Sequence, residues 1–180
     1  MSDTPKAKQK SGKYGLMRER DLTQTLMVSR TNIGSSRLQS PGARRSVMPL
    51  DKDVTRLARG KNLATVVTLM PSGQPQALLT WVDADDEHVL INTEPQRQRS
   101  RNVARDPRIT VLIHGEDPQD WAEVRGHVAE TVDGDEARRH IDELSRKYTG
   151  HDFTAPVGPH GRVILTVTPD KINTPRLLGS

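Results

Sequence analysis

The sequence predicts an α+β fold in which six antiparallel strands form a small barrel with short helices beside it. Six runs rich in β-branched and apolar residues have the length of strands, and most are separated by short turns. Two stretches with helical spacing interrupt these runs, after the third strand and after the fifth. Because strands and helices do not alternate strictly, a doubly wound parallel sheet is disfavoured. The predicted strands are residues 63–70, 75–82, 88–93, 108–115, 121–132 and 162–172.

A short helix is predicted before the first strand. Asp51 is a favourable N-cap residue, and Val54, Leu57 and Ala58 share one face at helical spacing. Gly60 is suited to end the helix, since glycine is the commonest residue just past a helix C-terminus.

The first two strands are predicted to form a hairpin. Residues 71–74 join them with the sequence Pro-Ser-Gly-Gln, which is short and offers a glycine for positive φ. The acidic residues 83–87 follow the second strand and lack the spacing of a calcium-binding loop. They are therefore interpreted as a solvated turn that leads into the third strand.

A helix is predicted directly after the third strand. Thr93 and Gln96 match the two ends of a capping box, and Pro95 suits a first helical turn. Asp106 and Pro107 are suited to end this helix and start the fourth strand, because the residue before a proline disfavours the helical conformation.

The last predicted helix lies between the fifth and sixth strands. Asp133 is suited to begin it and Gly150 to end it. Four apolar or aromatic residues recur between them at helical spacing, which predicts one buried face. These are Ala137, Ile141, Leu144 and Tyr148.

Charge is distributed unevenly along the 180 residues. Residues 1–49 contain 10 of the 27 Lys and Arg but only 3 of the 23 Asp and Glu, and few large apolar side chains. We therefore expect residues 1–49 to be a basic, largely disordered extension and residues 50–180 to be one folded domain. The chain has no cysteine and no apolar run long enough to cross a bilayer, which predicts a cytoplasmic protein without a membrane partner.

Familiar catalytic and metal-binding motifs are absent from the sequence. The six histidines show no H-E-x-x-H or paired-ligand spacing, so no metal site is predicted. There is no G-x-S-x-G elbow, no Walker-type loop and no G-x-G-x-x-G, and no catalytic residue is assigned. The basic extension raises nucleic acid as a partner, but no aromatic stacking platform accompanies it, which disfavours this interpretation.

Five arginines gather between the third and fourth strands: Arg97, Arg99, Arg101, Arg105 and Arg108. Arg97 and Arg99 lie in or beside the first turns of the predicted helix, where free N–H groups and the helix dipole also favour an anion. Positive side chains there are unfavourable for the helix itself, and a bound phosphate would explain them. The alternative is a solvated helix face on which Glu94 and Asp106 neutralise the arginines.

Residues 63–132 resemble a known family. The blocks GQPQALLTWV, HVLINT, RSRNVARDPRI and EVRGHVAE are similar to successive blocks of the pyridoxamine 5'-phosphate oxidase-like flavin and deazaflavin oxidoreductases. The Arg-Asn-x-x-Arg-Asp-Pro-Arg block is the most specific, and the resemblance extends over about residues 50–175. It implies a six-stranded FMN-binding split barrel and a homodimer with two cofactor sites at the subunit interface.

The resemblance also implies which residues contact the cofactor. The ring would lie along the second strand, and the phosphate would be held at the end of the third strand and by the arginines that follow. In the deazaflavin-using branch a lysine is usual where this chain has Arg99; arginine retains phosphate binding, since it is the better bidentate ligand. The implied residues are Leu78, Leu79, Thr80, Trp81, Asn92, Thr93, Arg97, Arg99 and, from the second subunit, Arg125.

The implied activity is hydride transfer between the deazaflavin coenzyme F-420 and an unidentified small organic substrate. Such a cofactor carries the reactive hydride itself, so the protein needs no nucleophile or acid–base pair. Two alternatives stay open. One is an FMN-dependent oxidase or reductase of the pyridoxamine phosphate oxidase type, and the other is a non-catalytic protein that binds flavin, haem or a tetrapyrrole.

Overall fold

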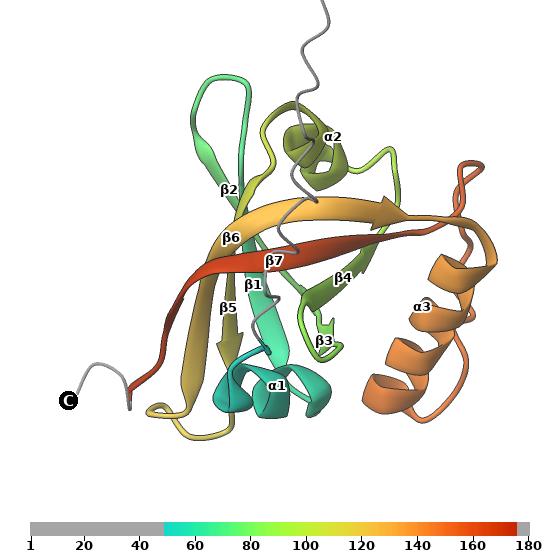
Figure 1. The fold of residues 1–180 in the computed structure, drawn as a ribbon. Helices are drawn as coiled ribbons and strands as arrows, with labels where there is room; N and C mark the ends of the chain where they lie inside the picture. The colour runs from blue at the N-terminus through green and yellow to red at the C-terminus, as the bar shows by residue number, and fades with distance from the viewer. Residues whose placement is uncertain (1–48, 176–180) are drawn as a thin grey trace, which may run out of the picture. The chain divides into compact units, whose positions relative to one another are not determined.

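The computed structural model describes residues 49–175. The predicted basic extension, residues 1–49, lies outside this part of the chain except for Pro49. Within residues 49–175, seven strands form one antiparallel sheet in the order β2-β1-β5-β6-β7-β4-β3 (Figure 1). The strands are β1 (Leu63–Leu69), β2 (Pro75–Trp81), β3 (Asp83–Ala84), β4 (Val89–Thr93), β5 (Arg108–His114), β6 (Trp121–Val132) and β7 (Val163–Asn173).

The sheet curls into a split barrel, as predicted, but it has one strand more than the predicted six. The additional strand is β3, which pairs Asp83 with Leu90 and Ala84 with Val89. These two residues belong to the segment that was interpreted entirely as a turn. The turn itself is therefore shorter, and the Asp85 carboxylate stabilises it by accepting hydrogen bonds from the backbone N–H groups of Glu87 and His88.

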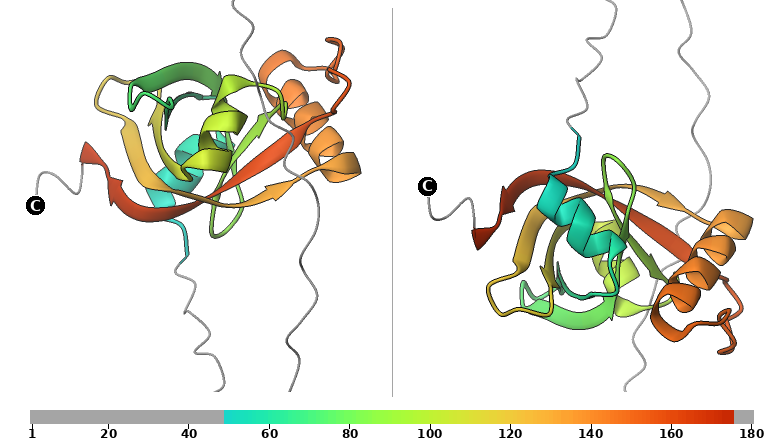
Figure 2. Two further views of the ribbon diagram at one scale, coloured as in Figure 1. Left: turned by 90° about the horizontal axis from the view of Figure 1, so that it is seen from above. Right: turned by 90° about the horizontal axis from the view of Figure 1, so that it is seen from below.

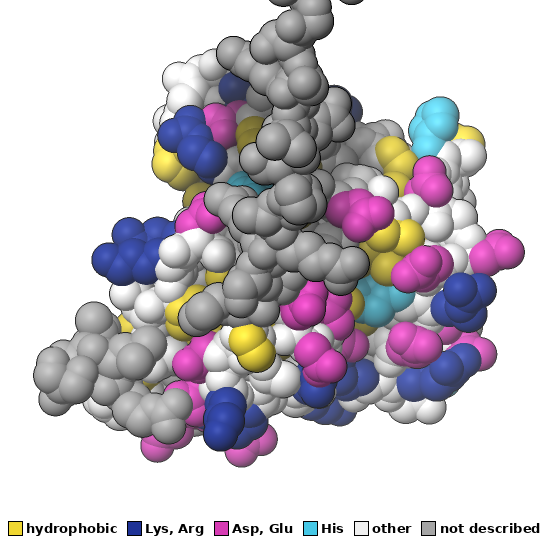
Figure 3. All heavy atoms as spheres, in the orientation of Figure 1, with side chains coloured by type: hydrophobic (Ala, Val, Ile, Leu, Met, Phe, Trp, Pro, Cys, Tyr) yellow, Lys and Arg dark blue, Asp and Glu magenta, His cyan; other side chains and the backbone are white. Residues whose placement is uncertain are grey.

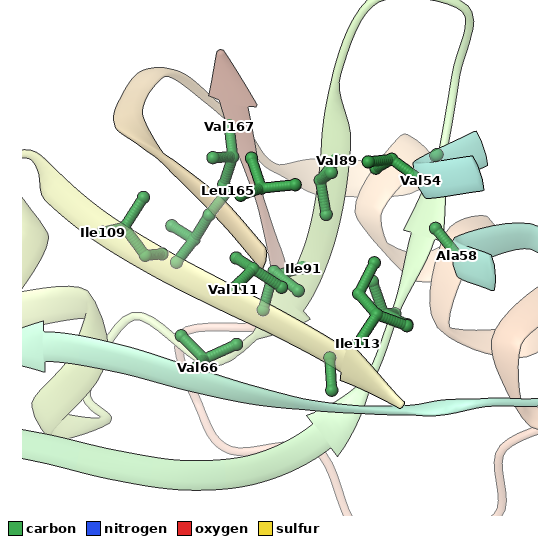
Figure 4. Close-up of a cluster of buried hydrophobic side chains, with 14 of the residues drawn as sticks. Val54, Ala58, Val66, Val89, Ile91, Ile109, Val111, Ile113, Leu165 and Val167 are labelled. Carbon is green, nitrogen blue, oxygen red and sulfur yellow. The ribbon is translucent and has the colours of Figure 1, made fainter. Parts of the chain in front are cut away.

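Helix α1 (Lys52–Arg59) lies across one end of the curled sheet (Figure 2). As predicted, Asp51 caps it by accepting a 2.8 Å hydrogen bond from the Asp53 N–H. Its buried residues Val54, Leu57 and Ala58 join the core that the strands enclose. Figure 4 shows Val54 and Ala58 among the inward-pointing side chains of the strands. The helix therefore closes one end of the barrel core.

Helix α2 (Gln98–Arg105) lies near the opposite end of the sheet from α1 (Figure 1). Asn102 attaches it to two strands, because its side-chain amide donates hydrogen bonds to Thr68 on β1 (2.9 Å) and Gln76 on β2 (3.2 Å). Asn102 is buried, and these bonds give it a structural role.

Helix α3 (Gly134–Thr149) follows β6 and lies beside β4 and β7. Ala137, Ile141 and Leu144 are buried on one face, as the spacing predicted. Gly150 ends the helix with a φ of 89°, a conformation that glycine adopts without strain. On the face shown in Figure 3, acidic and basic side chains alternate over the outer side of this helix.

None of the helices between residues 49 and 175 combines the length and the apolar character needed to cross a membrane.

Candidate functional site

The segment between β4 and α2 forms the centre of the candidate site. Thr93 is buried and paired with Val163 of β7, so it belongs to the sheet, and α2 begins only at Gln98. The predicted capping box is therefore wrong: a turn follows β4, and Arg97 is the N-cap residue of α2. This turn is held by hydrogen bonds to the Glu94 carbonyl from the Arg97 N–H (3.1 Å) and the Ser100 hydroxyl (2.8 Å).

Arg99 lies in the first turn of α2 with a largely buried guanidinium group. Its Nε and Nη1 atoms are inaccessible to solvent and have no hydrogen-bond partner among residues 49–175. Burial lowers the pKa of Arg99, and the nearby positive charge of Arg97 lowers it further. Arg99 is thus a desolvated cation with unused donors.

Three of the other clustered arginines have partners within the chain. Arg101 donates to the Gln96 carbonyl (2.8 Å), Arg105 to the Leu69 carbonyl (2.5 Å) and Arg108 to the Asp106 carboxylate (2.6 Å). Their guanidinium groups are bonded to backbone carbonyls or to a surface carboxylate, so these three arginines agree with the alternative of a solvated helix face. Arg99 does not agree with that alternative, because its guanidinium group is buried without such a partner.

Glu94 provides a carboxylate that two other arginines share. Its Oε1 atom lies 3.6 Å from Arg97 Nη2 and 3.3 Å from Arg162 Nη1. Glu94 and Arg162 are nearly buried, whereas the Arg97 side chain is 65% exposed. Burial lowers the pKa of Arg162; the Glu94 carboxylate opposes this shift, and the charges of Arg97 and Arg99 add to it. One carboxylate therefore accompanies three neighbouring positive charges, which favours binding of an anion.

Arg162 was not among the predicted site residues. It immediately precedes β7 and is 63 positions away from Arg99 in the sequence. Only the pairing of β4 with β7 brings it to the end of β4. The sole sequence signal was a lone arginine before a run of β-branched residues, which is common on protein surfaces.

Asn92 is buried at the end of β4, where it connects three parts of the chain. Its side-chain amide donates a 2.8 Å hydrogen bond to the Ala137 carbonyl on α3. Its side-chain oxygen accepts a 2.7 Å hydrogen bond from Arg162 Nε. Asn92 therefore holds Arg162 in place.

Strand β2 lies at an edge of the sheet and carries the residues predicted to contact the cofactor ring. Leu78 and Leu79 are exposed, and Thr80 and Trp81 are half-buried. Trp81 stacks on Tyr148 of α3, with ring centroids 5.1 Å apart and planes within 4°. The strand thus presents a fixed aromatic ring and an accessible apolar surface.

A cavity of about 330 Å³ lies between β2 and α3. Four of the predicted residues line it, namely Leu79, Thr80, Trp81 and Asn92, together with the unpredicted Arg162. A second cavity of about 340 Å³, between α2 and strands β6 and β7, is lined by none of the predicted residues.

Arg125 was expected to reach the site from the second subunit, and its position within one chain does not test that expectation. It lies on β6, where its guanidinium Nε is 3.3 Å from the Glu123 carboxylate. It lines neither cavity.

Comparisons with known proteins agree with this architecture. The model of the pyridoxamine 5'-phosphate oxidase family matches residues 50–175. The solved structure of an F420 reductase is 26% identical, with a TM-score of 0.59, and the match covers 66% of this chain and 94% of that one. No curated protein matches.

Two further solved structures show the same fold at lower identity. A conserved hypothetical protein from Mycobacterium tuberculosis is 23% identical, with a TM-score of 0.54 and coverage of 77% of this chain and 93% of that one. A Listeria innocua protein provisionally named pyridoxamine 5'-phosphate oxidase is 18% identical, with a TM-score of 0.52 and coverage of 68% and 94%. Because the family model matches residues 50–175 and the sheet forms a split barrel, the chain belongs to the pyridoxamine 5'-phosphate oxidase family.

Proposed function

We propose that this protein is an oxidoreductase that transfers a hydride between the deazaflavin coenzyme F-420 and a small organic substrate. The observation that carries the proposal is the buried guanidinium of Arg99, whose Nε and Nη1 donors have no partner within residues 49–175. A buried cation with unused donors is costly unless a ligand completes it. A phosphate group is such a ligand, since it accepts several charge-assisted hydrogen bonds.

The residues around Arg99 fit a phosphate. Arg97 adds a second guanidinium that is mostly exposed and reaches Glu94 only at 3.6 Å, so it is free to turn toward a stronger anion. Both arginines lie at the N-terminal end of α2, where the helix dipole favours negative charge. In this proposal, Arg97 and Arg99 hold the phosphate of the coenzyme.

Strand β2 fits the role of supporting the ring. Its edge position leaves one side of the backbone unpaired within the described sheet, so its peptide groups are available along Leu78, Leu79 and Thr80. The neighbouring Trp81 and α3 limit access of water from one side. The bound coenzyme supplies the hydride, and the protein binds and orients it and excludes water.

The F420 reductase favours F-420 as the coenzyme, since its sequence identity to this chain is higher than that of the other two similar structures. FMN is the second candidate, because arginine binds either phosphate and the family takes its name from pyridoxamine 5'-phosphate oxidase.

A homodimer forms part of the proposal. Leu63, Leu78 and Leu79 are large apolar side chains that stay exposed on β1 and the edge strand β2. Their burial against a second copy would complete the site beside the ring, and Arg125 would reach that site from the partner subunit. Exposed apolar surface beside a binding site is typical of such interfaces.

Parallel titrations with F-420 and FMN test the proposal. We expect saturable binding of F-420, with weaker binding of FMN. The protein with reduced F-420 should also accelerate oxidation of the coenzyme by menadione, a general hydride acceptor, measured by coenzyme absorbance. Tight binding of FMN alone would replace F-420 in the proposal. Binding without acceleration would favour a non-catalytic binder, and binding of neither coenzyme would contradict the proposal.

A further inference from the structure

The cavity between β2 and α3 has a chemical character that phosphate binding does not explain. Most of its lining is apolar or aromatic, and its volume of about 330 Å³ suits a small organic molecule. The apolar and aromatic lining residues are Leu63, Leu79, Trp81, Ile141, Leu144 and Phe153.

The aromatic side of this cavity is rigid. Trp81 stacks on Tyr148 and meets Phe153 edge-on, with centroids 6.4 Å apart and planes at 88°. The Tyr148 hydroxyl accepts a 3.2 Å hydrogen bond from the Val82 N–H, which fixes its ring. A flat wall that is already ordered binds planar molecules at a small entropic cost.

Phe153 is fixed from α3 as well. Its backbone N–H donates to the Asp142 carboxylate (3.1 Å), and its carbonyl accepts from Arg138 Nη2 (3.1 Å). The same Arg138 pairs with Asp142 at 2.9 Å. The segment that carries Phe153 is therefore tied to the helix and does not collapse into the cavity.

Arg162 provides the cationic group of the lining. Its guanidinium lies over the Phe153 ring at 5.3 Å and is 11% exposed. Nε is bonded to Asn92 and Nη1 to Glu94, which leaves Nη2 as the guanidinium nitrogen that these two partners within residues 49–175 do not engage. Nη2 is thus a partly desolvated donor at the wall of a mostly apolar space.

We infer that this cavity binds the organic substrate of the proposed oxidoreductase, and that the substrate is a planar, largely apolar molecule with one carboxylate. The plane packs against Trp81 and Phe153, and the carboxylate accepts a charge-assisted hydrogen bond from Arg162 Nη2. This inference rests on the proposed function only for the substrate role.

The position of the cavity suits that role. Leu79 and Thr80 line it and also belong to the stretch of β2 along which the coenzyme ring is proposed to lie. A ring on this strand would form one side of the space, so that a planar substrate would lie next to the group that carries the hydride.

Calorimetric titration of the full chain with trans-cinnamate and with cinnamamide tests the inference. The two probes share one planar shape, but only cinnamate carries a charge at pH 7. We expect cinnamate to bind about tenfold more tightly, because only its carboxylate forms the charged hydrogen bond with Arg162. Equal affinities, or no measurable binding of either probe at millimolar concentration, would overturn the inference.

Two variants locate the bound probe. Arg162→Met should abolish the preference for cinnamate while cinnamamide affinity changes less than about twofold. Phe153→Ala, in a loop and outside the buried core, should weaken both probes and keep their ratio. If Phe153→Ala leaves both affinities unchanged, the probes bind elsewhere and the inference is wrong, even where Arg162→Met does not fold.

Adding the coenzyme separates this inference from the proposed function. With F-420 bound, cinnamate should still bind, because the ring is proposed to form one side of the cavity rather than to fill it, and the phosphate site at Arg97 and Arg99 lies outside the cavity lining. Displacement of cinnamate by F-420 would assign the cavity to the coenzyme and overturn the inference. If neither F-420 nor FMN binds and the cinnamate preference persists, the proposed function fails, whereas the assignment of the cavity to a planar carboxylate is supported.

Discussion

The guanidinium Nε of Arg162 donates a 2.7 Å hydrogen bond to the side-chain oxygen of Asn92, although 70 residues separate them in the sequence. The same asparagine donates to the Ala137 carbonyl of α3. One buried amide therefore connects β4, the start of β7 and α3. These three elements shape both the cavity and the group of arginines around Glu94.

Asn92→Ala is expected to reduce the free energy of unfolding by about 2–4 kcal/mol, because it leaves a buried carbonyl and a buried guanidinium without their partner. Urea unfolding followed by circular dichroism measures the change. Gln119→Ala, on the exposed β5–β6 turn, is a control with an expected effect below about 0.5 kcal/mol. A loss at Asn92 no larger than the control would show that the amide does not connect these elements.

His140 predicts how stability depends on pH. Its Nδ1 lies 3.3 Å from the Asn92 amide nitrogen, and its Nε2 is buried without a hydrogen-bond partner among residues 49–175. Burial lowers the pKa of His140 below the ordinary 6.5, with opposing effects of Asp83 and Glu143 and smaller contributions from Lys147 and Arg162. The unfolded chain therefore takes up the proton at higher pH than the folded protein does.

The contribution of His140 to stability is accordingly complete above about pH 6.5 and is lost as the pH falls through the lowered pKa. His140→Gln keeps an acceptor for the Asn92 amide and removes the titration. The difference in unfolding free energy between wild type and variant should shift against the wild type between pH 7 and pH 5. A difference that is constant over this range would contradict the prediction.

Removal of residues 1–45 is expected to leave folding and coenzyme binding unchanged. The elements that form the candidate site begin after Leu50, and the basic charge of the extension lies outside them. Far-ultraviolet circular dichroism and a titration with F-420 compare the truncated chain with the full one. If the truncated protein folds and dimerises but no longer binds the coenzyme, the extension is part of the site.

The protein is expected to be a homodimer at micromolar concentration. Light scattering should give twice the mass of one chain, and Leu79→Glu should shift the protein toward the monomer, because it places a charge on the exposed apolar surface of β2. Gln119→Ala, an exposed substitution on the β5–β6 turn, is the control and should leave the mass unchanged. A monomer for the wild-type protein would contradict both the dimer and a site shared between subunits.

Local patterns in the sequence predicted most of the fold. The spacing of Ala137, Ile141 and Leu144 identified the buried face of α3, because helical periodicity alone determines which side chains share a face. The error at Thr93 has the opposite cause. A capping box describes the local sequence, but Thr93 is paired with Val163, and pairing with a distant strand outweighs a local preference.

The site could be predicted only in part. The sequence identified the group of arginines, but which of them is buried without partners depends on how α2 packs on β1 and β2. Glu94 was considered only as a neutralising residue, and Arg162 was missed, because the contact between them needs the pairing of β4 with β7.

Substitution of Arg99 separates a phosphate site from a charged helix face. Arg101→Ala is the matched control, since it removes the same charge from the same helix but from a guanidinium that the Gln96 carbonyl and Gln98 side chain already satisfy. Circular dichroism should show that both variants retain the wild-type fold.

The dissociation constant of F-420 for wild type, Arg99→Ala and Arg101→Ala is the measurement that tests the account most directly. Arg99→Ala should weaken binding by at least about tenfold, which corresponds to the loss of a charge-assisted hydrogen bond of about 1.5–3 kcal/mol. Arg101→Ala should change it less than about threefold. Equal affinity of the wild type and Arg99→Ala, or equal weakening in both variants, would contradict the assignment of Arg99 to the phosphate.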